Sequence, residues 1–339
     1  MESKPQVTIA IPTYNRLNYL KEAVSSALCQ TYPNIEILIS QNPHRDQYVR
    51  GEIAEYCAAL AARESKVRYE LRPTNLGPSE NHQWVFENAR GAYVILIGDD
   101  DRLLPNAIET LVSAIVPDAT VIFGRRHILD SEGRRQPPLV APADPDASYF
   151  DGWPFSQYEV PPGVLPDAEQ WAWRQGMGVE SSIIRTDVFR RVRYPAHLDM
   201  PDMEFFIVLA RQGDRFVFVP EYVTEYRFHS NSTTGRGFLN FRELFDDLER
   251  LSVRPEIEPY KCKYLRMLAF RAVSRALLVG DVDYARRLLA SKYYPRDVRT
   301  GSKGLMIKAS AALPGHLGAY AYNLLYAIRF GQRYKSASV

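Results

Sequence analysis

Three consecutive carboxylates, Asp99-Asp100-Asp101, follow an apolar run at 92–98. In an extended chain, Asp99 and Asp101 share one face and Asp100 points to the other. Two carboxylates about 5 Å apart repel by roughly 3 kcal/mol at an effective dielectric near 20, and a divalent cation relieves that repulsion. Carboxylate oxygens suit Mg²⁺ or Mn²⁺, which complete their shells with water and substrate phosphates. The triplet therefore predicts a metal site; the alternative is an acidic turn that caps a helix beginning near Pro105.

A further carboxylate, Asp202, follows Pro201 at the expected start of a helix. The helix dipole favours an ionised carboxylate there. Asp202 shares a face with apolar residues three, four and seven positions on, so it is either a cap or a functional group. Glu204 lies roughly 200° around the axis and points elsewhere.

Three other polar groups stand beside predicted strands. The turn at 12–15 follows the first apolar run, Asn75 and Asn81 flank the start of a helix, and His229 ends a strand-like segment. The first two are more typical of strand–helix connections than of ligand sites. The imidazole of His229 can complete a metal site that Asp101 begins.

The apolar patterns predict the elements that position these residues. Strands are expected at 7–11, 35–40, 67–71, 92–98 and 119–124, and helices at 17–28, 52–62, 79–89 and 105–115. Such alternation predicts a parallel sheet with both faces covered, whose ligands bind at the carboxyl ends of the strands. The segments expected on this one rim are 12–15, 41–43 and 99–101.

The remaining chain has a different character. Residues 125–170 are rich in Pro, Gly, Asp and aromatic side chains, which is typical of loops, and the pattern from 238 onward is mostly helical. A helix over 202–212 and a β-rich segment lie between these regions. We therefore expect a domain over 1–237, with halves at 1–124 and 125–237, and a helical region over 238–339.

Composition limits the class of protein. A chain of 339 residues, 46% hydrophobic and 24% charged, suits a folded protein with a sizeable core. Three widely spaced cysteines without a CxxC pair argue against a disulfide framework and favour the cytoplasm. We expect no secretory leader and, since no 18-residue apolar stretch occurs, no membrane span.

The net charge of +2 is unevenly distributed. Residues 261–339 contain 15 Lys and Arg against 3 Asp and Glu, so the rest of the chain is acidic. Basic amphipathic helices can lie on anionic membranes, here the inner face of the cytoplasmic membrane. The alternative is a helical cap whose basic face is solvated or paired with the acidic body.

Together these features resemble a family 2 glycosyltransferase with the GT-A fold. The resemblance rests, in this order, on VTIAIPTYNRLNYLKEAVSSALCQTYPNIEILIS, RPTNLGPSENHQWVFENARGAYVILIGDDDRLLPNAIETL and PDMEFFIVLARQGDRFVFVPEYVTEYRFH. It implies a mostly parallel α/β sheet flanked by helices, a nucleotide-sugar donor, Mn²⁺ or Mg²⁺, and transfer with inversion. It also implies a saccharide or lipid-linked saccharide acceptor, as in bacterial surface polysaccharide assembly, and no nucleic acid partner.

The resemblance also implies roles for individual residues. The positions assigned to the donor are Pro12, Thr13, Tyr14, Asn15, Asn42, Asn75, Asn81, Asp99 and Asp100. Those assigned to the metal are Asp101, Asp99 and His229. The general base is Asp202, with Glu204 as its rival, and the acceptor side holds Gly176, Gly178 and Trp173.

Two departures from the family pattern leave questions open. The second strand ends Ser40-Gln41-Asn42-Pro43 where an Asp pair is common, so the nucleotide base is not defined. The usual Glu-Asp pair reads Pro201-Asp202. Alternatives are a nucleotidyltransferase, for which the first turn lacks a Gly- and Lys/Arg-rich loop, and a non-catalytic carbohydrate-binding or scaffold protein on the same fold.

Overall fold

The computed structural model describes residues 4–137, 157, 159–195, 197–198, 201–229, 241–296 and 301–330. Contacts divide the chain into two compact units. The first contains the described residues of 1–140 and 154–237, and the second contains those of 238–339. Much of the loop region expected over 125–170 lies outside the described residues.

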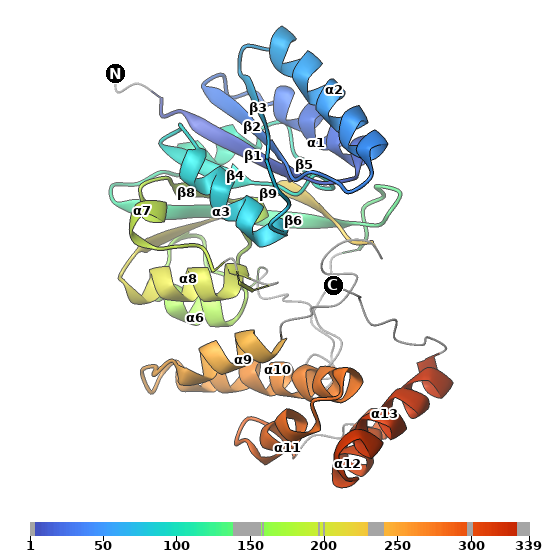
Figure 1. Cartoon of the computed structure of the whole chain (residues 1–339). Helices are drawn as coiled ribbons and strands as arrows, with labels where there is room; N and C mark the ends of the chain where they lie inside the picture. Colours follow the sequence, from blue (N-terminus) through green and yellow to red (C-terminus); the bar gives the residue numbers. More distant parts are fainter. Residues whose placement is uncertain are drawn as a thin grey trace. The chain divides into compact units, whose positions relative to one another are not determined.

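The first unit is a sheet with helices packed against it (Figure 1). Its strands are β1 (Val7–Thr13), β2 (Ile35–Gln41), β3 (Val67–Leu71), β4 (Tyr93–Leu96), β5 (Arg102–Leu103), β6 (Ala119–Leu129), β7 (Gly163–Val164), β8 (Ser182–Arg185) and β9 (Arg215–Arg227). Its helices are α1 (Leu17–Leu28), α2 (Gln47–Arg63), α3 (Pro78–Asn88), α4 (Ala107–Ser113), α6 (Ala168–Trp173), α7 (Val188–Arg191) and α8 (Pro201–Arg211), with a 3₁₀ turn, η2, at Val179–Ser181.

The sheet is mixed, with the order β3-β2-β1-β4-β8-β6-β9-β5 and with β7 paired to β9. Strands β1 to β4 pair in parallel, as do β6 and β9, whereas β8 runs antiparallel to both β4 and β6. The expected mostly parallel sheet flanked by helices is therefore confirmed. Strand β8 was not expected, because a four-residue strand has too few positions to show a periodicity.

The core lies on both faces of the parallel strands. Every residue of β1 and β2 is buried, as expected for central strands of a parallel sheet. Ile9, Ile37 and Ile95 share one apolar cluster with Leu20 and Val24 of α1. The helix α2 begins five residues earlier than the expected 52–62, because Asp46 caps it by accepting a hydrogen bond from the Tyr48 amide at 2.8 Å.

The second unit is helical, as expected, with α9 (Phe241–Arg250), α10 (Glu258–Val279), α11 (Val282–Ala290), α12 (Gly301–Ala312) and α13 (Gly315–Phe330). Several basic side chains of 261–292 are paired within this unit. Arg287 of α11 contacts Asp246 at 2.8 Å and Glu249 at 2.7 Å, both on α9. Among the described residues, none of the helices has the length and apolar character needed to cross a membrane.

The close approach of β1 and β4 depends on Gly91, just before β4. A Cβ placed there would lie 2.7 Å from the Gln6 carbonyl oxygen and from the Thr8 amide nitrogen. The Gly91 amide also donates to the Thr8 hydroxyl at 2.9 Å. Glycine at position 91 therefore lets β1 and β4 approach each other at the end where both strands begin.

We predict that Gly91→Ala lowers the free energy of unfolding by about 1–3 kcal/mol, because backbone atoms have to move. Gly51, in the exposed interior of α2, is the control, since a Cβ there meets nothing within 4 Å. Gly51→Ala should stabilise the chain by about 0.5–1 kcal/mol. Urea unfolding measures both; equal effects of the two substitutions would contradict this account.

Candidate active site

The acidic triplet lies in a turn directly after β4. The Asp101 amide donates to the Gly98 carbonyl at 3.1 Å, which closes the turn. The expected alternation of side chains is wrong, because the chain turns here instead of staying extended: Asp99 and Asp100 both pair with Arg16. Glycine at position 98 leaves room for the carboxylates, because a Cβ would lie 2.5 Å from an Asp100 carboxylate oxygen and would displace it.

Residues from the first turn surround the triplet. The Thr13 hydroxyl donates to Asp99 at 2.7 Å, and the guanidinium of Arg16 forms ion pairs with Asp99 and Asp100. Arg16 was not expected in the site, although it directly follows the turn at 12–15. The available signal was the position of Arg16. A basic residue at the end of one loop of the rim can pair with carboxylates in another loop of the same rim.

His229, after β9, also reaches the triplet, but at Asp100 rather than at Asp101. Its Nε2 lies 3.0 Å from a carboxylate oxygen of Asp100. Burial opposes ionisation of Asp100, yet the hydrogen bond from His229 and the charge of Arg16 hold its pKa below the usual value. This carboxylate is therefore the most firmly ionised of the three.

The negative charges of the other two carboxylates, Asp99 and Asp101, are only partly compensated by their surroundings. Burial raises the pKa of Asp99, in spite of Arg16, and raises the pKa of Asp101 further, with the charge of Asp100 adding to the effect. The buried carboxylate oxygens of Asp99 and Asp101 thus carry more negative charge than the nearby positive charge neutralises. Such a donor set fits a hard divalent cation, with Asp99 and Asp101 as the residues that would hold it.

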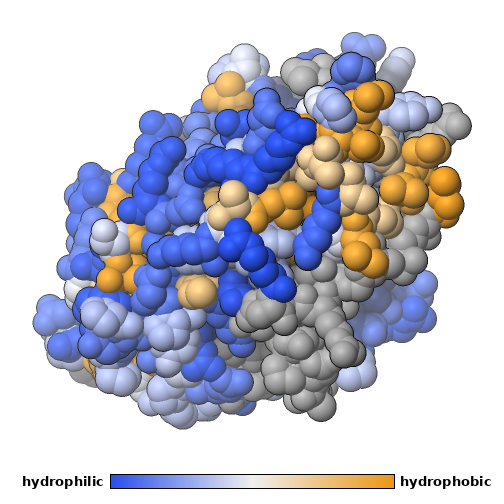
Figure 2. Space-filling model, turned by 90° about the horizontal axis from the view of Figure 1, so that it is seen from below, coloured by the Kyte–Doolittle hydropathy of each residue, from blue (hydrophilic) through white to orange (hydrophobic). Residues whose placement is uncertain are grey.

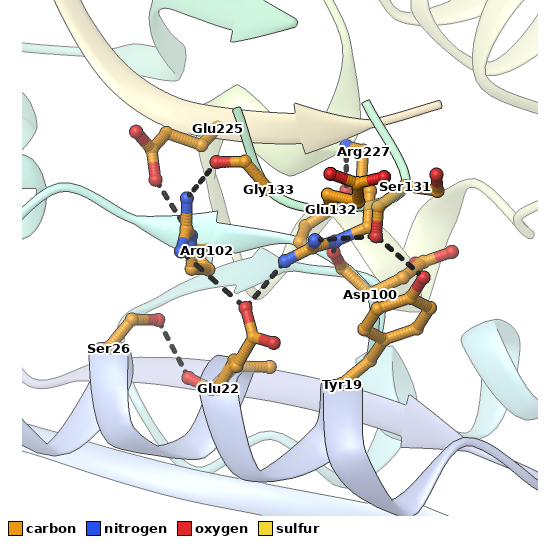
Figure 3. Close-up of polar contacts among 12 residues, drawn as sticks. Tyr19, Glu22, Ser26, Asp100, Arg102, Ser131, Glu132, Gly133, Glu225 and Arg227 are labelled. Atoms are coloured by element: carbon orange, nitrogen blue, oxygen red, sulfur yellow. Dashed lines mark hydrogen bonds and ion pairs between the residues drawn. The ribbon is translucent and has the colours of Figure 1, made fainter. Parts of the chain in front are cut away.

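Arg227, the last residue of β9, ties the triplet to the surrounding segments (Figure 3). Its amide donates to the Asp101 carboxylate at 2.9 Å and its Nε to the Asp100 carbonyl at 2.8 Å. Its guanidinium pairs with Glu22 of α1 at 2.6 Å and lies 4.5 Å from the ring centre of Tyr19. The Arg227 side chain is buried, so these contacts hold the turn of the acidic triplet in place from the interior.

A second arginine extends this network. Arg102 of β5 pairs with Glu225 at 2.8 Å and with Glu22 at 3.5 Å, and it donates to the Gly133 carbonyl at 3.2 Å. Figure 3 shows both arginines meeting over Glu22. Helix α1, strand β9 and the segment after β6 are thereby joined beneath the rim.

Several of the residues expected to contact the donor lie at the ends of β1 and β2. Thr13 pairs in register with Gln41, and the Asn42 amide donates to the Thr13 carbonyl at 2.9 Å. The rim expected from segments 12–15, 41–43 and 99–101 is therefore present. Pro12 is buried beside it, Tyr14 lies 4.8 Å from the His44 ring, and Asn15 is exposed.

The three asparagines expected to contact the donor differ in their exposure and in their hydrogen bonds. Asn81 is buried, and its amide exchanges hydrogen bonds with Ser40 at 2.6 and 3.0 Å. Asn42 donates to the Gly77 carbonyl at 2.8 Å. Asn75 is exposed and accepts from the Gly77 amide at 2.9 Å. Asn42 and Asn81 thus shape the rim, and a direct donor contact by any of the three stays a prediction.

Asp202 lies in the first turn of α8, where it is only partly exposed. The Tyr194 hydroxyl donates a hydrogen bond to it, and the Val179 amide is a second donor. Burial and the charge of Glu180 outweigh these bonds and the charge of Arg126, and raise the pKa of Asp202 to about 6. A carboxylate near this pKa accepts a proton readily at neutral pH.

The residues expected on the acceptor side precede Val179, whose amide contacts Asp202. A Cβ on Gly178 would overlap the buried ion pair of Arg126 and Glu180, so this position requires glycine. Gly176 is buried and donates to the Trp171 carbonyl at 2.9 Å. Trp173 is 1% exposed, so its ring supports this segment from inside. Glu204, the rival base, is partly exposed one turn into the same helix.

Glu180 connects the two groups of carboxylates. Its charge raises the pKa of Asp101 as well as that of Asp202. Neither Glu180 nor its partner Arg126 could be predicted from the sequence, because they are 54 positions apart and meet only through the pairing of β6 with β8. The site therefore contains two distinct centres, an acidic triplet and a raised-pKa carboxylate.

Comparison with known proteins places this arrangement in a family. Residues 8–168 match the profile described as Glycosyl transferase family 2. The chain is 31% identical over 235 residues to glycosyltransferase GlyG of Streptococcus pneumoniae, covering 67% of this chain and 72% of GlyG. It is 33% identical over 132 residues to an uncharacterized glycosyltransferase of Rickettsia felis, but the match spans 21% of that longer protein.

Solved structures agree on the fold. The crystal structure of S. aureus TarS 1-349 has a TM-score of 0.54 at 13% identity, with 97% of this chain and 93% of that chain covered. Mannosyltransferase PcManGT from Pyrobaculum calidifontis has a TM-score of 0.54 at 14% identity, with 98% and 89% covered. The expected GT-A fold is confirmed, and the chain belongs to glycosyltransferase family 2.

Proposed function

We propose that this protein transfers a sugar from a nucleotide-diphosphate donor to an acceptor hydroxyl, with inversion at the anomeric carbon. The observation that carries the proposal is the separation of two carboxylate centres beside one rim. One is the triplet at 99–101, crowded with negative charge, and the other is Asp202, whose pKa is raised to about 6. A metal-dependent transferase needs one centre of each kind.

The donor would bind along the rim made by the ends of β1, β2 and β4. TarS has been solved in complex with UDP and with UDP-GlcNAc, and PcManGT with GDP-Man and Mn²⁺. These complexes support a nucleotide-sugar donor and a divalent metal for this chain. Thr13 and the residues at 41–43 would border the nucleotide, and Asp99 to Asp101 its diphosphate.

A divalent cation, when bound, neutralises the charge that builds on the leaving diphosphate. Asp99 and Asp101 would hold it, and Arg16 would then pair mainly with Asp100. The Arg227 amide and side chain keep the turn fixed whether or not a donor is present. The orientation of the carboxylates therefore needs little reorganisation on binding.

Asp202 would remove the proton of the attacking hydroxyl. Its position in the first turn of α8 leaves it partly exposed, so a hydroxyl can approach it. The Tyr194 hydroxyl and the Val179 amide orient the carboxylate. We infer that the acceptor is a saccharide or lipid-linked saccharide, bound near Gly176 and Gly178, as in bacterial surface polysaccharide assembly.

The proposed base gives a direct test. Asp202→Asn keeps the shape and the hydrogen bond acceptor but cannot take a proton, so kcat should fall about 10²–10⁴-fold. Donor binding, measured by calorimetry with Mn²⁺, should stay within about threefold, because the base contacts the acceptor. Glu204→Gln is the matched comparison; a larger loss in kcat for that variant would make Glu204 the base.

The pH profile tests the surroundings of Asp202. The base works when ionised, so kcat/KM should fall as pH drops through about 6. Glu180→Gln removes a charge that raises this pKa and should move the acid limb to lower pH. Tyr194→Phe removes a hydrogen bond that lowers it and should move the limb to higher pH. Shifts in the same direction would contradict the assignment.

Metal dependence tests the triplet. EDTA should abolish transfer, and Mn²⁺ or Mg²⁺ should restore it. Asp101→Asn should weaken Mn²⁺ binding, measured by calorimetry without donor, by about tenfold or more. Asp118→Asn is the control, because Asp118 is exposed at a φ of 63°, which asparagine tolerates. Full activity in EDTA would rule out the metal; binding of donor without any transfer would favour a scaffold.

A further inference from the structure

The hairpin of α12 and α13 exposes a row of large apolar side chains. On α13 these are Leu317 at 51%, Tyr320 at 70%, Leu324 at 50% and Ile328 at 73% exposed. Leu305 of α12 is 70% exposed. Figure 2 shows apolar side chains gathered on the side of the surface where these two helices lie. Single exposed apolar residues are ordinary, but a contiguous group marks an interaction site.

The four residues of α13 form one stripe, since their spacings of three and four positions repeat the helical period. The opposite side of the helix is buried against α10. There the Tyr322 hydroxyl lies 2.7 Å from the Ser274 hydroxyl, and Asn323 donates to the Leu278 carbonyl at 3.1 Å. The helix thus has one side, with Ala319 and Tyr322, buried against its own unit and an opposite apolar side that the described residues leave exposed.

The exposed stripe belongs to a firmly built hairpin rather than to a frayed end. Gly318 lies so close to the Ser310 carbonyl that any side chain there would overlap it. Arg286 of α11 donates to the Ala311 carbonyl at 3.0 Å and to the Leu313 carbonyl at 2.7 Å, where α12 ends. The fold therefore holds the apolar stripe in place facing outward.

The amino-acid sequence of this segment is basic, which indicates what covers the stripe. Residues 301–339 contain Lys303, Lys308, Arg329, Arg333 and Lys335, and no Asp or Glu. Lys308 is exposed. Basic residues beside an apolar helix face are attracted to anionic lipid, by about fivefold in affinity for each residue near the surface. A second copy of the chain would instead bring two basic segments together, and like charges repel.

The dimensions favour a surface position. Helix α13 has 16 residues, about 24 Å at 1.5 Å per residue, which is shorter than the hydrocarbon core of a bilayer at about 30 Å. The basic residues of 261–292 are less suited to this role, because Arg287 pairs with α9 and the buried Lys261 donates to the Glu249 carbonyl at 2.9 Å.

We propose that the outward face of α12 and α13 binds the surface of an anionic lipid bilayer. The apolar stripe lies at the level where headgroups meet acyl chains, and the basic residues face the lipid phosphates. Binding requires no reaction in the first unit. It attaches the protein to the membrane surface through residues of the second unit.

The test uses the full chain and two kinds of vesicle, phosphatidylcholine alone and phosphatidylcholine mixed with phosphatidylglycerol. In co-sedimentation at low salt, the chain should bind the anionic vesicles at least about tenfold more tightly than the neutral ones. The combined variant Leu317→Ser, Leu324→Ser and Ile328→Ser should lose about tenfold or more of that affinity. Absence of binding to anionic vesicles would overturn the proposal.

A matched control separates the stripe from general surface hydrophobicity. The substitutions Leu71→Ser, Val164→Ser and Val279→Ser remove apolar residues of similar exposure, 44%, 48% and 56%, from other elements. This variant should bind vesicles like the unmodified chain. Equal losses in both variants would overturn the proposal, and melting curves and donor calorimetry identify a variant that has not folded.

A charge variant provides a second measure that leaves the apolar stripe unchanged. Lys308→Glu, Arg333→Glu and Lys335→Glu together should weaken binding to anionic vesicles about tenfold or more, and high salt should do the same to the unmodified chain. Light scattering determines whether the chain self-associates. A dimer that the serine variant of α13 abolishes, without vesicle binding, would assign the stripe to a second copy instead.

Discussion

The burial of several carboxylates close together is the constraint on which the site in the first unit depends. Five acidic side chains, Asp99, Asp100, Asp101, Glu180 and Asp202, influence one another through low-dielectric surroundings. Three arginines from distant parts of the chain keep this arrangement folded: Arg16, Arg126 and Arg227. Each lies in a different part of the chain, so the folded sheet is what brings the three arginines to the carboxylates. Removing one partner of such a buried pair costs more than the pair contributes.

The carboxylates differ in how far ion pairs and hydrogen bonds compensate their negative charge, and this difference separates their roles. Asp100 is stabilised as an anion by His229 and Arg16, whereas Asp101 has backbone donors but no ion pair of its own among the described residues. Asp202 is intermediate, since Tyr194 and the Val179 amide offset part of the effect of burial. The same side-chain chemistry is therefore tuned in three ways by burial and by neighbouring groups, which is typical of sites that handle charge and protons separately.

Much of the fold could be predicted from sequence, because strands such as β1 and β2 carry continuous apolar runs and the helices between them keep the helical period. The rim could also be predicted, because the carboxyl ends of parallel strands meet at one edge of the sheet. The turn at the triplet could not be predicted, because local spacing says nothing of Arg16 or Arg227 reaching it. Short elements such as β8, and the Arg126–Glu180 pair that its placement creates, depend on tertiary pairing that no local pattern records. Direct ligand contacts, including those of Asn75 and His229, remain predictions.

The Arg227 network also has a consequence for local motion. One side chain is bonded to α1 through Glu22, to the Asp100 carbonyl and to the Ser131 carbonyl after β6. None of these segments can open without breaking a contact that the others share. Local unfolding of the rim is therefore cooperative, and its backbone amides should exchange with solvent deuterium as one block, with a common opening free energy, rather than loop by loop.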